Sequence, residues 1–208
     1  MVEDRSEQII HFFQHLDRSL FINNENREYS HQDRALPIGY DQTISQPSLV
    51  LQMTLALEIE ESSKVLEVGT GSGYQTVLLA EFASRVFSME RVPELAWEAQ
   101  ERVKQMGYDN VRFCVEDGSL GWPTFAPYDR IMVTAAAGKI PQPLLEQLQI
   151  GGRMIVPVGP PGDQELLLVT KNQEGTISIQ PLANVSFVEF KGRYGWDNQK
   201  AADDGEEF

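Results

Sequence analysis

A glycine-rich run, VLEVGTGSGY at residues 65–74, limits the fold of this chain more than any other stretch. The residues before Gly69 are mostly apolar and suit a buried strand, and those after Gly73 suit a helix. Glycines at such a junction let the backbone approach a ligand and leave free amides at the helix start. The run therefore predicts a ligand-binding loop at the carboxyl end of a strand.

Strand-like and helix-like patterns alternate around this loop. The patterns predict strands at 64–68, 85–90, 111–115 and 128–135, helices at 74–82 and 93–106, and a short helix at 143–148 before a strand at 153–159. Such alternation indicates an α/β fold with a Rossmann-like, doubly wound parallel sheet. Later strand-like segments at 165–171, 176–180 and 185–190 are separated by turn formers and suit antiparallel C-terminal strands.

The N-terminal part precedes this alternation and has a helical pattern. Apolar spacing predicts a helix over 6–20, a polar connector over 21–35, and a second helix from Pro47, because proline suits a first helical turn. Ser45 lies just before that helix and suits its N-cap, with Thr43 as the alternative cap. Local sequence physics favours the cap as the role of Ser45.

Charge excludes several classes of partner. The chain has 31 acidic and 17 basic residues, for a net charge of −14. Such a surface repels phosphate backbones and anionic lipid, so neither nucleic acid nor a membrane is expected as a partner. The acidic N-terminus is unlike a signal peptide and no apolar run reaches a transmembrane length, so a cytoplasmic location is expected.

Two further features argue against redox and metal chemistry. Cys114 is the only cysteine and stands in an apolar run, so we expect a buried, inert thiol. His11 and His15 are four residues apart, but no third ligand accompanies them, so no metal site is expected.

Three acids lie at the carboxyl ends of the expected strands, where a parallel sheet places its ligands. Glu67 lies two residues before Gly69 and could attract an ammonium group. Glu90 lies 21 residues after Gly69, close to the interval at which an acid meets ribose hydroxyls. Asp117 is placed to accept a hydrogen bond from an amine such as that of adenine. Taken singly, each acid also suits a surface, helix-start or turn role.

The spacing of the glycines narrows the ligand further. Gly69, Gly71 and Gly73 do not form the G-x-G-x-x-G pattern of dinucleotide sites or the G-x-x-x-x-G-K-[ST] pattern of triphosphate loops. Acids at three strand ends instead suit a nucleoside that carries positive charge. S-adenosylmethionine, which has ribose, adenine, an ammonium and a sulfonium, fits that description.

With these residues assembled, the sequence resembles the protein-L-isoaspartate O-methyltransferases over residues 33–196. The pieces that carry the resemblance include LPIG, QTISQP, VLEVGTGSGYQT, ERVPEL, EDGSLGWP, APYDRIMVTAAA and GGRMIVPVG. The resemblance implies transfer of a methyl group from S-adenosylmethionine to the α-carboxylate of L-isoaspartyl residues in damaged proteins and peptides. Succinimide formation and repair would follow.

The resemblance also implies roles for individual residues. It makes Ser45 the catalytic serine and assigns substrate contacts to Ser45, Ser48 and Val188. The implied cofactor-binding residues are Gln42, Thr43, Ile44, Glu67, Gly69, Thr70, Gly71, Ser72, Gly73, Glu90, Arg91, Asp117 and Gly118. The chain departs from the family pattern at Asp41, Ser48, Ser186, Glu189 and Phe190, in segments expected to touch the peptide.

We therefore expect one methyltransferase domain over residues 1–200, acting as a monomer on isoaspartyl proteins or peptides. It would comprise a helical and lid segment (1–60), a cofactor-binding core (61–160) and C-terminal strands (161–196), followed by an acidic, disordered tail (197–208). Two alternatives remain: a carboxyl methyltransferase for aspartate in one dedicated peptide, and a silent S-adenosylmethionine-binding module. Ser45 and the intact glycine loop argue against the silent module.

Overall fold

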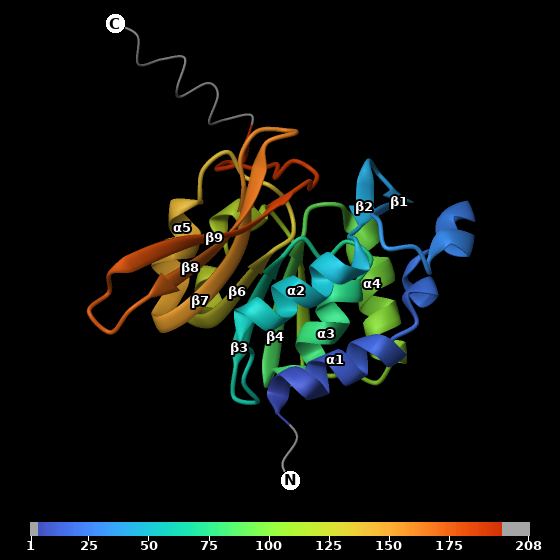
Figure 1. Cartoon of the computed structure of the whole chain (residues 1–208), viewed down its shortest axis with the longest axis horizontal. Helices are drawn as coiled ribbons and strands as arrows, with labels where there is room; N and C mark the ends of the chain where they lie inside the picture. The colour runs from blue at the N-terminus through green and yellow to red at the C-terminus, as the bar shows by residue number, and fades with distance from the viewer. Residues whose placement is uncertain (1–3, 197–208) are drawn as a thin grey trace, which may run out of the picture.

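The computed structural model describes residues 4–196, and Figure 1 shows a sheet running through its centre. The sheet has seven strands in the order β5-β4-β3-β6-β7-β8-β9. These are β3 (Lys64–Val68), β4 (Arg85–Glu90), β5 (Val111–Val115), β6 (Tyr128–Val133), β7 (Leu148–Val158), β8 (Gln164–Lys171) and β9 (Ile177–Val185). Neighbours from β5 to β7 are parallel, whereas β8 and β9 pair antiparallel. The expected α/β fold with antiparallel C-terminal strands is confirmed.

Helices cover both faces of the sheet, as the side chains of β3 show. Val65 packs in a cluster with α1 (Arg5–His15), α2 (Pro47–Leu57) and α3 (Tyr74–Phe82), which lie side by side in Figure 1. The next residue, Leu66, points to the opposite face and shares a cluster with Leu144 of α5 (Gln142–Gln147). No helix within residues 4–196 combines the length and apolar character that crossing a membrane requires.

A small hairpin stands apart from the main sheet. Strands β1 (Leu36–Gly39) and β2 (Gln42–Ile44) pair antiparallel through a tight turn. Tyr40 and Asp41 form this turn with φ of 55° and 56°, a backbone region that residues other than glycine rarely adopt. Aspartate is among the residues other than glycine that adopt this region most readily.

Several predicted boundaries were wrong, among them the strand predicted at 176–180, which runs to Val185. The helix predicted over 6–20 ends at His15, and the side chain of Asp17 then caps a separate 3₁₀ turn, η1 (Arg18–Phe21), by accepting from the Ser19 amide. The strand predicted from 153 begins at Leu148, since β7 passes through both glycines that were expected to delay it.

Residues 185–190 were also predicted wrongly, as a strand. β9 ends at Val185, and the segment beyond makes one isolated bridge, between Ala136 and Glu189. The amide side chain of Gln164 binds both the N–H and the C=O of Phe187, which holds the backbone away from the sheet edge. The segment is thereby directed across the end of β6.

Cys114 is less buried than expected. It lies on β5, the outermost parallel strand, and is half-buried. Partial burial and the nearby Glu116 raise the pKa of its thiol, which keeps the thiol in its unreactive form.

The start of α2 is capped by a residue distant in sequence. Neither Ser45 nor Thr43 caps it: the N-cap position is Gln46, whose side chain makes no capping bond. Asp33 instead accepts a hydrogen bond from the Ser48 amide at 2.8 Å and one from the Gln46 side chain at 3.0 Å. These bonds lower the pKa of Asp33. The local prediction of a Ser45 cap was therefore wrong, and the Ser45 side chain is free for another role.

We expect Asp33→Ala to lower the free energy of unfolding by about 1 kcal/mol, because the helix loses its capping acceptor. Ser45→Ala should change it by less than about 0.5 kcal/mol, because that side chain makes no cap. Urea denaturation of both variants checks this. A larger loss in Ser45→Ala than in Asp33→Ala would contradict the assignment.

Candidate active site

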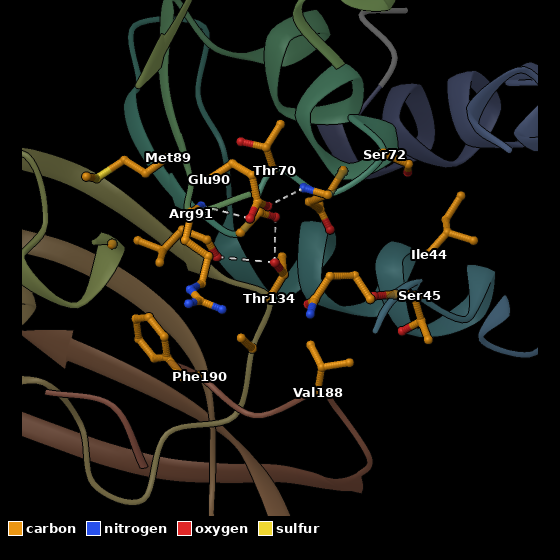
Figure 2. A pocket seen from close by; sticks show the side chains of 18 of the residues that line it. Ile44, Ser45, Thr70, Ser72, Met89, Glu90, Arg91, Thr134, Val188 and Phe190 are labelled. Atoms are coloured by element: carbon orange, nitrogen blue, oxygen red, sulfur yellow. Dashed lines mark hydrogen bonds between the residues drawn. The ribbon is translucent and has the colours of Figure 1, made fainter. Parts of the chain in front are cut away.

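A pocket opens at the carboxyl ends of β3, β4 and β6. Figure 2 shows Ile44 and Ser45 of the hairpin segment on one side and Met89, Glu90 and Arg91 on the other. The glycine loop and the segment around Val188 contribute further parts of the wall.

The first glycine of the loop, Gly69, lets the side chain of Thr134 approach the loop backbone closely. Gly69 has a φ of 101°, and a Cβ there would collide with the side-chain oxygen of Thr134. Thr134 donates to the Gly69 carbonyl at 2.7 Å, and the amides of Gly69 and Thr70 donate to the Met89 carbonyl. The loop is thus tied to β4 and to the end of β6.

The third glycine has a different role from the first. A Cβ on Gly73 would approach the Ala99 side chain of α4 (Pro93–Gln105) to 3.3 Å, so this glycine lets α3 and α4 pack closely. Gly73 does not line the pocket. The structure therefore places it in helix packing, away from the ligand position expected from sequence.

Glu90 lines the pocket with its carboxylate held by backbone amides. One oxygen accepts from Gly71 at 2.9 Å, and the other accepts from Arg91 at 2.8 Å and Val92 at 3.0 Å. The residue is 7% exposed. Three fixed amides compensate the buried charge and orient the carboxylate at the mouth of the glycine loop.

Glu67 lies beneath the loop and does not line the pocket. Its side chain is fully buried on the α3 side of the sheet, where one oxygen accepts from Thr76 at 2.6 Å and from Ser88 at 2.5 Å. The Ser88 hydroxyl also contacts that of Thr70, which faces the pocket. Burial raises the pKa of Glu67 to about 8, although the two hydroxyls oppose that shift.

The hairpin segment supplies the opposite wall. Gln42, Thr43, Ile44 and Ser45 all line the pocket, and Ile44 is buried. Within residues 4–196 no hydrogen bond occupies the Ser45 hydroxyl, whereas the Ser45 carbonyl accepts one from Arg18 at 3.0 Å. An uncommitted hydroxyl at the pocket wall can donate a hydrogen bond to a ligand.

Most residues predicted for the site meet in this one pocket. They are Gln42, Thr43, Ile44, Ser45, Gly69, Thr70, Gly71, Ser72, Glu90, Arg91, Gly118 and Val188. Ser48 lies outside it and is exposed, with its hydroxyl accepting from Gln46. Asp117 also lies outside: its oxygens accept from the Ser119 amide at 2.9 Å and the Arg193 amide at 2.6 Å. That carboxylate therefore anchors the C-terminal segment in this structure.

A family model described as Protein-L-isoaspartate(D-aspartate) O-methyltransferase (PCMT) matches residues 3–195. The chain belongs to this family. The protein-L-isoaspartate O-methyltransferase of Dictyoglomus turgidum is 48% identical over 192 residues, covering 92% of this chain and 87% of the relative. Protein-L-isoaspartate O-methyltransferase 1 of Syntrophobacter fumaroxidans is 48% identical over 196 residues, covering 94% and 90%.

Solved structures agree with the sequence relatives. A protein-L-isoaspartate O-methyltransferase structure superposes with a TM-score of 0.82 at 27% identity, covering 100% of this chain and 67% of that one. The family resemblance predicted from the motifs is thereby confirmed.

Several pocket residues of this family member were not predicted. They are Val50, Val68, Tyr74, Gln75, Met89, Thr134, Ala135 and Lys191. Glu189 and Phe190 also line it, and the sequence indicated only that their segment touches the peptide. Thr134 carried a usable signal, because it is a polar residue at the carboxyl end of an apolar strand, as Glu90 is. Gln75 and Lys191 carried none, since their positions depend on how α3 and the C-terminal segment pack.

The pKa of Glu67 makes the stability of this protein-L-isoaspartate O-methyltransferase family member depend on pH. A glutamate in the unfolded chain titrates near 4.3, whereas burial raises the pKa of Glu67 in the folded chain to about 8. Between these values the folded state holds a proton that the unfolded state has lost. The free energy of unfolding should therefore fall as pH rises from about 4.5 to about 8 and level off above.

We expect Glu67→Gln to flatten this dependence, because the amide is neutral at every pH. At pH 9 the variant should be more stable than the wild type by at least about 1.4 kcal/mol, the equivalent of one pKa unit. Urea denaturation at pH 5, 7 and 9 measures it. Glu61→Gln, at an exposed turn, controls for the lost charge. A parallel pH slope in wild type and Glu67→Gln would contradict the assignment.

Proposed function

We propose that this protein is a protein-L-isoaspartate O-methyltransferase that uses S-adenosylmethionine to methylate the α-carboxylate of L-isoaspartyl residues in damaged proteins and peptides. One observation carries the proposal: a single pocket joins the Ser45 hydroxyl to the glycine loop and Glu90. The methyl ester then permits succinimide formation, and hydrolysis of the succinimide returns part of the chain to normal aspartate.

The pocket suits the proposed cofactor. The side-chain oxygen of Gln75 is buried at the pocket wall and has no hydrogen-bond donor within the described residues, so it can accept from the ammonium group. Glu90 can accept from ribose hydroxyls, and the absence of a side chain at Gly69 and Gly71 lets the ligand approach the backbone. When bound, S-adenosylmethionine supplies an electrophilic methyl group on a positively charged sulfur.

The remaining assignments follow the pocket walls. We assign cofactor contacts to Gln42, Thr43, Ile44, Gly69, Thr70, Gly71, Ser72, Glu90, Arg91 and Gly118, and peptide contacts to Ser45 and Val188. Glu67, Gly73 and Asp117 support the cofactor site from outside the pocket. Asp117 does so by holding the C-terminal segment that carries Phe190 and Lys191 toward the pocket.

The chemistry requires little from the protein. An isoaspartyl carboxyl has a pKa of about 4, so at neutral pH it is already an anionic nucleophile and needs no general base. The Ser45 hydroxyl donates to one carboxylate oxygen, and the other oxygen bonds to the methyl carbon as the carbon–sulfur bond breaks and its electrons stay on sulfur. Ile44 and Val188 exclude water from the carboxylate and the sulfonium. The opposite charges of these two groups are neutralised when the carboxylate attacks the methyl carbon.

A neutral hydroxyl is better suited to this task than a cation. A lysine or arginine at position 45 would stabilise the substrate carboxylate more than the transition state, in which that negative charge is being lost. Ser45 therefore orients the nucleophile without lowering its reactivity.

We further propose that the enzyme acts as a cytoplasmic monomer on isoaspartyl proteins and peptides, and binds neither nucleic acid nor membranes. The net charge of −14 supports the exclusion of nucleic acid and anionic lipid.

Methyl transfer from labelled S-adenosylmethionine to matched peptides tests the function. We expect the label to enter a peptide that contains L-isoaspartate and not the same peptide with normal aspartate. Preference for the aspartyl peptide would favour a dedicated aspartyl carboxyl methyltransferase. Labelling of neither peptide, with S-adenosylmethionine still bound, would indicate a silent binding module.

Ser45→Ala is the matched variant for this assay. We expect its kcat/KM for the isoaspartyl peptide to fall about 100-fold, because misorientation of a reactant costs about that much. Its affinity for S-adenosylhomocysteine, measured by calorimetry, should stay within about twofold, since Gln75 and Glu90 are untouched. Full activity in Ser45→Ala would remove the serine from the mechanism.

A further inference from the structure

Arg18 is a buried arginine whose hydrogen bonds all go to backbone carbonyls. It lies in η1 and is 5% exposed. One terminal nitrogen donates to Ser30 and Gln32, both at 3.1 Å. The other donates to the carbonyls of Arg34 at 2.8 Å and Ser45 at 3.0 Å, and it shares one of its two hydrogens with the carbonyl of Ile44 at 3.4 Å.

This arrangement is an unusual way to bury a charge. No carboxylate among residues 4–196 lies within ion-pair distance of the Arg18 guanidinium. Burial lowers the pKa of Arg18, but an arginine stays protonated in proteins. The negative ends of five carbonyl dipoles compensate the charge, and a smaller side chain would remove the donor that these five carbonyls share.

The carbonyls of Ile44 and Ser45 have a special position. The Ile44 carbonyl belongs to the peptide plane that precedes the Cα of Ser45, and the Ser45 carbonyl belongs to the plane that follows it. A planar peptide has no internal freedom, so fixing both planes fixes φ and ψ of Ser45. The direction of the Cα–Cβ bond is then set, and the hydroxyl is limited to the staggered rotamers about that bond.

We propose that Arg18 is the positioning residue of the catalytic serine: by binding the carbonyls on both sides of the Ser45 Cα, it aims the hydroxyl into the pocket. This inference rests on the proposed role of Ser45 in methyl transfer. The other three carbonyls, from residues 30–34, brace the guanidinium against the segment that leads into the hairpin. Arg18 itself does not line the pocket and touches no reacting atom.

The chain offers a matched control at the other end of α2. Arg153 also donates two bonds to one backbone carbonyl, that of Ala56, at 3.0 and 3.3 Å, and pairs with Glu58 at 3.0 Å. It therefore anchors the same helix without reaching the Ser45 peptides. Arg→Lys at either site keeps the charge but replaces a planar fork with a point charge that has three donors.

The test is a double-mutant cycle with Arg18→Lys and Ser45→Ala. Arg18→Lys alone should lower kcat/KM for the isoaspartyl peptide about tenfold or more, with the affinity for S-adenosylhomocysteine within about twofold of wild type. The double variant should be no slower than Ser45→Ala, because Arg18 acts through the hydroxyl that is already gone. In the control cycle, Arg153→Lys with Ser45→Ala should show no such coupling.

Two results would overturn the proposal. Losses that multiply in the Arg18→Lys, Ser45→Ala double variant would show that Arg18 acts independently of the serine. Equal effects of Arg18→Lys and Arg153→Lys on kcat/KM would reduce Arg18 to a general structural anchor.

Hydrogen exchange gives a readout that does not need the reaction. In Arg18→Lys, amides of residues 42–46 should exchange at least about tenfold faster than in wild type, while β3 and β6 keep their rates. Unchanged exchange at 42–46 would overturn the proposal. If the wild type methylates no isoaspartyl peptide, the proposed function fails, and hydrogen exchange still decides whether Arg18 fixes the Ser45 backbone.

Discussion

The close approach between Gly69 and Thr134 is the contact on which the site depends. Thr134 follows β6 and donates to the carbonyls of Val68 at 3.2 Å and Gly69 at 2.7 Å, which joins the ends of two adjacent parallel strands. The chain crosses from β3 to β4 on one side and reaches β6 on the other, so the strand order reverses here. Ligands of doubly wound sheets bind at such a point. The pocket, the glycine loop and Glu90 all meet beside this contact.

Three buried ionisable side chains, Glu90, Glu67 and Arg18, lie around the pocket, and each is stabilised by a different set of contacts. Three backbone amides donate to the Glu90 carboxylate, whereas burial raises the pKa of Glu67 to about 8. Arg18 keeps its charge because backbone carbonyls hold it. In each charged case the partner is the backbone, which cannot change rotamer. Backbone groups therefore hold Glu90 beside the glycine loop and Arg18 beside Ser45.

Features that depend on local periodicity were predicted correctly from the sequence. Roles that a contact with a distant residue determines were not. β3, α3 and β4 were predicted correctly because a buried strand or helix shows its period over a few residues. Ser45 was predicted locally as a cap, whereas Asp33, twelve residues upstream, makes the capping bonds. Asp117 binds the amide of Arg193, 76 residues away, so no local pattern could reveal its role.

The affinity of the Gly69→Ala and Gly107→Ala variants for S-adenosylhomocysteine tests most directly whether the site depends on the Gly69–Thr134 contact. Both glycines have positive φ, 101° and 91°, so alanine strains the backbone similarly at each position. A Cβ at Gly69 would strike Thr134, but a Cβ at Gly107 would meet nothing within 4 Å. We predict at least about tenfold weaker binding in Gly69→Ala and less than about twofold in Gly107→Ala, by calorimetry on folded protein. Equal affinities in the two variants would contradict the central role of the Gly69–Thr134 contact.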